Sequence, residues 1–175
     1  MKAYISLARE MPKGVYRRAL KAEVKVIEGN ADDLLWDLAV HKYVLQKVIN
    51  ALWELDKLPK KSQVHQLFYP VLRSYGFRAH VVRNIYKTAL ALVKSARENK
   101  GSKPLIRKMS TRLDYQDARV DLENGVVKVI LRNKWCTLKL IHRREYIERF
   151  KGLRWKEVHV KYCNGKLYVS IVFEV

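Results

Sequence analysis

Apolar and polar residues alternate one by one near the beginning and near the end of the chain. Residues 21–28, KAEVKVIE, alternate in this way and predict a half-buried strand. Residues 158–162 and 167–173 show the same alternation on either side of Asn164–Gly165. An Asn-Gly pair between two such runs is a strong signal for a β-hairpin. The C-terminal stretch is therefore predicted to be a hairpin with one apolar face.

Between residues 101 and 141 the pattern is again that of strands. Residues 104–113 read as extended, residues 118–132 contain a second hairpin signal at Asn124–Gly125, and residues 135–141 predict a further strand. Residues 142–155 join this strand to the last hairpin as a short helix or an ordered loop.

Residues 30–100 follow helical spacing instead. A first helix begins near Asp32, with Asn30 or Asp32 as its N-cap, and ends before Pro59. A second runs from Ser62 to Tyr75, where Pro70 is expected to kink or divide it. A third extends from about residue 78 to 98 and stops near Gly101.

The order of these elements is one strand, three helices and then at least five strands. Segregated elements indicate an α+β fold, because a parallel sheet would alternate strands with helices. The early strand cannot stand alone and must pair with the later ones. We therefore predict an antiparallel β-barrel domain of residues 1–29 and 101–175, with residues 30–100 inserted as a three-helix subdomain.

Charge points to a polyanionic partner. The chain has 36 Lys and Arg against 17 Asp and Glu, a net charge of +19, and the excess is shared almost equally between residues 1–100 and 101–175. A folded protein with such a surface typically binds nucleic acid. A surface tuned only for solubility mixes both signs more evenly.

Other classes of protein are disfavoured. No apolar run reaches the ~20 residues of a membrane span, and Arg9, Glu10 and Lys13 interrupt the region of a signal peptide, so a cytoplasmic location is expected. Cys136 and Cys163 form no Cys-x-x-Cys pair and suggest neither zinc nor a disulfide.

Catalytic signatures are also missing from the sequence. It contains no phosphate-binding loop, nucleophile elbow or His-Glu-x-x-His motif, and its five histidines are scattered. The carboxylates Asp114, Asp117, Asp121 and Glu123 accompany a hairpin rather than the end of a buried strand. We therefore expect no catalytic residue, no metal site and no cofactor, and no enzymatic activity of this chain on its own.

Candidate nucleic-acid-binding residues form three groups. Arginine matches phosphate oxygens with a fork of donors, and neighbouring aromatic rings can stack on unpaired bases. The groups are Lys103, Arg107, Lys108 and Arg112 in the extended segment; His142, Arg143, Arg144, Arg149, Lys151 and Arg154 before the last hairpin; and Tyr75, Arg78, Arg83 and Lys87 around the Gly76 turn. The third group weakly resembles a helix-turn-helix, although helix packing is the more common reason for such a turn.

Three stretches, in this order, resemble the N-terminal half of TnpB-type (OrfB) transposon proteins, relatives of type V CRISPR effector nucleases. They are GSKPLIRKMSTRL, LKLIHRREYIERFKGLRWKEVHVKY and NGKLYVSIVFEV. The likeness covers residues 21–175. The family's Pro-Thr-x-x-Gln after the first strand is absent, and Gly29-Asn30-Ala31-Asp32 stands there instead.

The resemblance implies a function. It makes the β part a wedge-type oligonucleotide-binding barrel and the helical part a recognition lobe, which together hold a guide RNA and contact a short DNA motif. The family's RuvC-like nuclease domain would follow Val175, so the chain is expected to be a recognition half without the cleavage domain, from a truncated gene or an expressed fragment.

Two other functions stay open. A self-sufficient nuclease or transposase would need clustered carboxylates, and a stand-alone helix-turn-helix regulator would prefer a duplex operator. The last strand is expected to be an exposed edge, and this edge or the helices would allow a homodimer.

Overall fold

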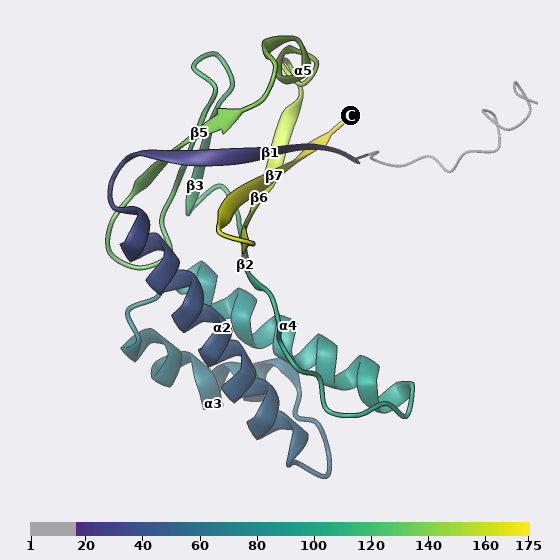
Figure 1. The fold of residues 1–175 in the computed structure, drawn as a ribbon. Coiled ribbons are helices and arrows are strands. Elements are labelled where there is room, and N and C mark those ends of the chain that lie inside the picture. Colours follow the sequence, from purple (N-terminus) through teal and green to yellow (C-terminus); the bar gives the residue numbers. More distant parts are fainter. Residues whose placement is uncertain (1–16) are drawn as a thin grey trace, which may run out of the picture.

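A computed structural model describes residues 17–175. The elements in chain order are β1 (Arg17–Glu28), α2 (Ala31–Trp53), α3 (Lys61–Ser74), α4 (Ala79–Glu98), β2 (Met109–Leu113), β3 (Ala118–Asp121), β4 (Val126–Val129), β5 (Cys136–Ile141), α5 (Arg144–Glu148), β6 (Arg154–Cys163) and β7 (Lys166–Glu174). Helices α2–α4 pack together on one side of the molecule and the strands form a curled layer on the other (Figure 1). The predicted α+β class is confirmed.

The strands form one antiparallel seven-stranded sheet in the order β2-β6-β7-β1-β5-β4-β3. Long, central β1 pairs with β7 through residues 17–24 and with β5 through residues 23–28. The early strand thus finds its partners among the later ones, as predicted. The sheet curls into a half-barrel (Figure 1), and within residues 17–175 its edge strands β2 and β3 do not pair with each other.

The predicted exposed edge at the last strand is wrong. β7 lies between β6 and β1, and residues 166–174 are paired on one or both sides. Periodicity could not show this, because the pairing of β1 with β7 joins the two ends of the described chain. The edges are β2 and β3.

Helix α2 begins where the sequence indicates. The Asn30 side chain accepts hydrogen bonds from the backbone amides of Asp32 at 2.8 Å and Asp33 at 3.3 Å, which satisfies two donors of the first turn. At the other end, Arg97 of α4 donates to the carbonyl oxygens of Leu52 and Trp53 in the last turn of α2. The two helices are therefore joined at this end by more than apolar packing.

Helix α3 is continuous through Pro70, so this proline does not divide it; the kink predicted as the other possibility stays a prediction. Val64 and Leu72 lie on either side of Pro70 and are both buried. Their packing against the rest of the core holds the two halves in one helix despite the missing backbone donor.

Buried side chains of the helices and of the sheet belong to one hydrophobic cluster. It includes Leu38 and Ile85 from the helices and Val160, Ile171 and Phe173 from the sheet. The alternating apolar positions predicted for the last hairpin are thus confirmed as core. The boundaries predicted for two domains stay a prediction.

Candidate nucleic-acid interface

A groove of ≈ 690 Å³ lies between α2, α4 and the chain from Leu105 to Arg112. Four basic side chains line it, and we call it the basic groove after them: Lys87, Arg107, Lys108 and Arg112. All four are exposed residues. Apolar side chains, among them Leu45, Leu92 and Ile106, form part of its lining. Such a surface combines cations with a partly apolar floor.

Helix α4 supplies one wall because its two flanks differ. Val82, Ile85, Ala89 and Val93 are buried, while Arg83 and Lys87, four residues apart, are exposed on the opposite flank. Their spacing of four residues places both on one flank, and this flank faces away from the core.

Gln46 of α2 fixes the other wall. Its side-chain amide donates to the carbonyl oxygen of Pro104 at 3.1 Å, and its side-chain oxygen accepts from the backbone amide of Ile106 at 2.7 Å. These bonds replace strand pairing in a segment that has no regular secondary structure before Met109. They hold the backbone from which Arg107 and Lys108 extend.

A buried histidine lies at the base of the groove. Nε2 of His41 is 3.2 Å from Oγ1 of Thr111 in β2, and Nδ1 has no hydrogen-bond partner. Burial lowers the pKa of His41 to about 4, so the ring is neutral near pH 7. His41 therefore links α2 to the sheet as a neutral ring.

A second hollow of ≈ 310 Å³ adjoins the groove and shares Asn84, Lys87 and Arg112 with it. Arg83 and His80 line its far side. Glu157 pairs with Arg112, with Nε and Oε2 3.1 Å apart, which orients the guanidinium while the Arg112 side chain stays more than half exposed. The basic surface therefore continues from the groove along α4.

Arg78 has a different environment from its neighbours. Its Nε lies 2.7 Å from Oδ1 of Asp117, whose side chain is only 2% exposed. Next to it, Nδ1 of His80 is 2.6 Å from Oδ2 of Asp114. The first turn of α4, which a helix-turn-helix protein inserts into the major groove, is thus held against the β2–β3 connection.

The arginine-rich group around α5 lies at the opposite end of the molecule from α2–α4 (Figure 1). The His142 ring packs on Tyr146 with centroids 3.9 Å apart, and Phe150 is buried. Acidic neighbours occupy part of this group: Arg144 pairs with Glu148, and Lys151 lies near Glu123 and Glu148.

Arg143 and Arg149 are exposed and form no ion pair within residues 17–175. Arg154 is exposed at the start of β6. The α5 group thus keeps free cations beside the paired ones and forms a second basic surface, separate from the groove.

Besides Arg78, two predicted residues lie outside both surfaces. Tyr75 lines a hollow between α2 and α3, away from the groove, and Lys103 is half-buried just before the groove segment. Sequence reasoning missed His159 and Asn84, which line the groove, and the anchoring role of Gln46. No local pattern in the sequence reveals these roles, because they depend on how distant segments meet. His159, for example, faces Arg112 across the paired strands β2 and β6.

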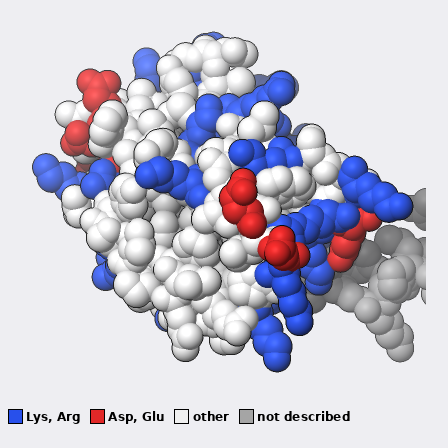
Figure 2. All heavy atoms as spheres, turned by 90° about the horizontal axis from the view of Figure 1, so that it is seen from below, with Lys and Arg blue, Asp and Glu red and all other residues white. Residues whose placement is uncertain are grey.

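Basic side chains outnumber acidic ones on the helical face shown in Figure 2, which also contains a broad region with neither. Within residues 17–175, no three His, Cys, Asp or Glu side chains converge as a metal site would require. In the same part of the chain, no helix is both long enough and apolar enough to cross a lipid bilayer.

Comparisons with known proteins give a distant structural likeness. No family model and no curated protein matches the sequence. Among solved structures, a chain of the Cas12f1–sgRNA–target DNA complex superimposes with a TM-score of 0.45 and 9% sequence identity, over 92% of this chain and 59% of that one. A likeness at this level assigns neither a family nor an activity.

Proposed function

We propose that this chain binds RNA and DNA phosphates through the basic groove. The observation that carries the proposal is the convergence of Lys87 of α4 with Arg107, Lys108 and Arg112 of the segment that follows α4 on one groove. Of these, only Arg112 has an acidic partner within residues 17–175. Cations held close together without anions of their own attract a polyanion.

The construction of the groove supports a binding role over a general surface charge. The segment that carries Arg107 and Lys108 is fastened to α2 by Gln46, and Arg112 is oriented by Glu157. Anchored side chains lose less conformational entropy on binding than free ones. The surface around α5 offers a second place for a phosphate backbone.

The finer proposal follows from the three motifs in the sequence. The chain acts as the guide-RNA and DNA-motif recognition part of a TnpB/OrfB-type, transposon-encoded RNA-guided endonuclease, and does not itself cut DNA. The groove segment lies within the first of those motifs, GSKPLIRKMSTRL. The α5 surface lies within the second.

A salt series tests the proposed binding. Affinity for a labelled RNA stem-loop is measured by filter binding over a range of KCl concentrations, for the wild type and for a variant with Lys87, Arg107, Lys108 and Arg112 all changed to Gln. Each phosphate contact contributes roughly 0.7 to 0.9 to the slope of log K against log salt. The slope measured for the groove variant should therefore be less steep by about 3, because four contacts are removed.

The matched control removes four exposed lysines elsewhere: Lys25, Lys57, Lys61 and Lys166. It has the same net charge as the groove variant and should keep a steeper slope. Equal slopes for the two variants would refute binding in the groove.

Two further assays address the other functions. Preference for one duplex over all RNA stem-loops would favour a DNA-binding regulator. Mg²⁺-dependent nicking of supercoiled DNA that is lost in Asp114→Ala or Asp121→Ala would show an enzyme and refute the non-catalytic role.

A further inference from the structure

A third hollow, of ≈ 560 Å³, lies between α2 and α3 and is lined by aromatic rings rather than by lysines. Its rings are Trp36, Tyr43 and Tyr75, and we call these three residues the aromatic shelf. None of them lines the basic groove. The shelf is therefore a separate surface.

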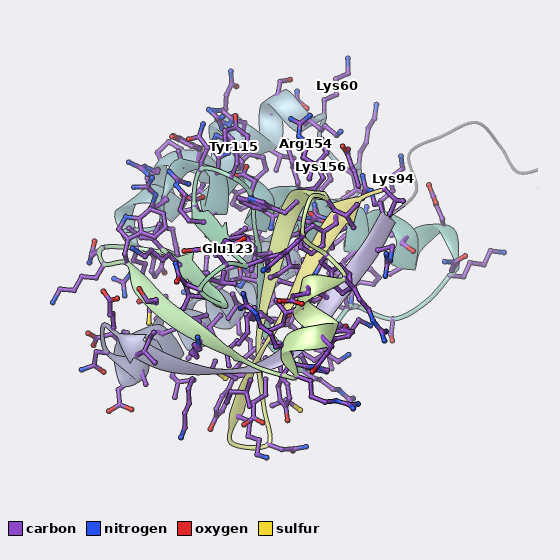
Figure 3. All side chains as sticks on the ribbon, turned by 90° about the horizontal axis from the view of Figure 1, so that it is seen from above. Lys60, Lys94, Tyr115, Glu123, Arg154 and Lys156 are labelled. Atoms are coloured by element: carbon purple, nitrogen blue, oxygen red, sulfur yellow. The ribbon has the colours of Figure 1, made fainter. Side chains whose placement is uncertain are left out.

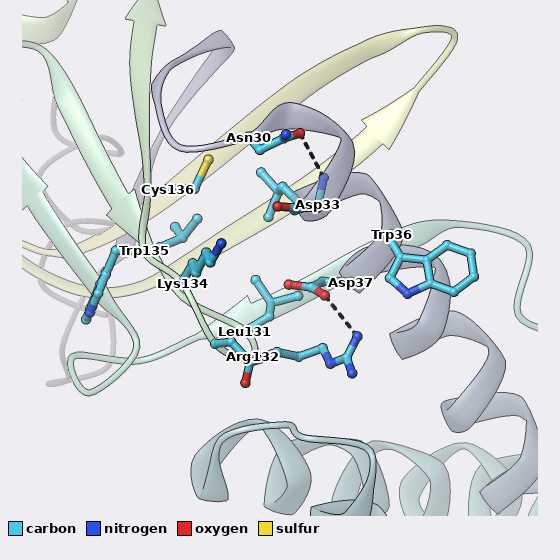
Figure 4. Close-up of a pocket in the computed structure, with 12 residues that line it drawn as sticks. Asn30, Asp33, Trp36, Asp37, Leu131, Arg132, Lys134, Trp135 and Cys136 are labelled. Atoms are coloured by element: carbon cyan, nitrogen blue, oxygen red, sulfur yellow. Dashed lines mark hydrogen bonds and ion pairs between the residues drawn. The ribbon is translucent and has the colours of Figure 1, made fainter.

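The shelf exposes rings that a fold normally covers. Trp36 is 65% exposed and Tyr43 55% exposed. They are seven residues apart on α2, which is two turns of one helix face and a rise of roughly 10 Å. In Figure 4 the Trp36 ring projects from α2 away from Trp135 and Cys136. Neither ring is needed to fill the core.

Cations accompany the rings. Nζ of Lys47 lies 5.1 Å from the centre of the Tyr43 ring. Arg132 lines the hollow near Trp36; its Nη1 is 3.3 Å from Oδ1 of Asp37, and its buried Nε has no hydrogen-bond partner. Asp37 offsets one of these two positive charges, so the rim of the shelf keeps a positive charge.

These charges indicate what occupies the shelf. A second copy of this chain would bring another +19 against the same face, which is electrostatically unfavourable. Unpaired nucleotides satisfy both features, because their bases stack on aromatic rings and their phosphates meet Lys47 and Arg132. We propose that the aromatic shelf binds a single-stranded stretch of nucleic acid by stacking; this rests on the proposal that the chain binds nucleic acid.

An acidic or apolar protein is the competing occupant. Leu67 and Val71 are each 56% exposed on α3 and share a helix face with Tyr75, which extends the apolar area. The experiment must therefore separate stacking from protein association.

The test titrates the protein with labelled oligo(U) and, in parallel, with a blunt-ended RNA duplex, which has no unpaired bases. The variants are Trp36→Ala, Tyr43→Ala and Trp36→Phe; the matched control is Tyr115→Ala, which removes a ring that is also 65% exposed but lies in the β2–β3 connection (Figure 3). Loss of one stacking ring should weaken oligo(U) binding about tenfold. Trp36→Phe should retain most of the affinity, and the control all of it.

The parallel titration distinguishes the two proposals. Binding of the blunt-ended duplex should not change in the shelf variants, because it offers no unpaired base to stack. Unchanged oligo(U) affinity in Trp36→Ala would overturn the proposal that the shelf binds single strands, and would leave the proposal for the basic groove intact. Normal stem-loop binding by the groove variant would overturn the proposal for the groove. Sedimentation that shows self-association lost in Trp36→Ala, with oligo(U) affinity unchanged, would identify a protein interface and also overturn the shelf.

Discussion

Gln46 and Ile106 are sixty residues apart, and the side-chain oxygen of the first accepts the backbone amide of the second at 2.7 Å. With the bond from Gln46 to Pro104, this contact fixes a non-strand segment on α2. One wall of the basic groove is therefore held in place by the Gln46 side chain. Its charges come from other residues, so anchoring and binding can be perturbed separately.

Gln46→Ala should loosen that wall. It removes both bonds and leaves the Ile106 amide without its partner, at a cost of about 1 kcal/mol since the segment can turn toward water. Hydrogen exchange at Ile106 should accelerate, and stem-loop affinity should fall although no positive charge is lost. The control is Gln66→Ala, because the Gln66 side chain is exposed on α3. Normal exchange at Ile106 in Gln46→Ala would contradict the anchoring role.

Arg78 and Arg83, both predicted as binding residues, should respond differently to mutation. Arg78→Ala leaves the buried carboxylate of Asp117 unpaired, which should lower the free energy of unfolding by about 2 to 4 kcal/mol. Arg83 is exposed and forms no ion pair within residues 17–175. Arg83→Ala should therefore leave stability unchanged and weaken stem-loop binding.

Urea unfolding and filter binding of the two variants separate these effects. Asp117→Asn in the Arg78→Ala background should recover stability, because no buried charge then remains. If Arg78→Ala were as stable as the wild type, the ion pair would not have the structural role assigned to it.

Elements with a strong local period were predictable from the sequence. Asn30 as an N-cap, the basic flank of α4 and both Asn-Gly hairpins follow from spacing and turn chemistry. The central place of β7 and the contact of Gln46 with Ile106 depend on residues far apart in the chain. No pattern of neighbours contains that information.

The same limit applies to the candidate site. Arg107, Lys108 and Arg112 were identified by charge, and the structure adds Lys87 to them by folding α4 alongside. Tyr75 was assigned to the same turn as Arg78, yet it faces the other side of the helices. Charge alone could not show which basic residues have acidic partners.

Cys136 should resist thiol reagents in the folded protein. Burial, with a smaller effect of Asp33, raises the pKa of its thiol to about 11, so very little thiolate exists at pH 8. In a Cys163→Ser variant, labelling by a disulfide reagent should be slow in buffer and fast in guanidinium. Rapid labelling of the folded variant would show that Cys136 is accessible.

His41 should make stability depend on pH in a defined window. Its pKa is about 4 in the folded protein, below the ordinary value of 6.5, because the charged ring would be buried. As the pH falls, the unfolded chain therefore takes up this proton at a higher pH than the folded protein does. The stability due to the neutral ring is complete above pH 6.5 and is lost as pH falls toward 4, by roughly 3 kcal/mol in all and about 2 kcal/mol by pH 5.

His41→Gln isolates this effect, since Gln can still form a hydrogen bond with Thr111 and does not titrate. Urea unfolding at pH 7.5 and pH 5 should show a smaller loss of stability in the variant than in the wild type. Carboxylates that titrate below pH 5 contribute equally to both proteins and cancel in the difference. Parallel pH profiles for the two proteins would mean that the His41 ring takes up its proton inside the fold, and α2 would then meet β2 through a charged group.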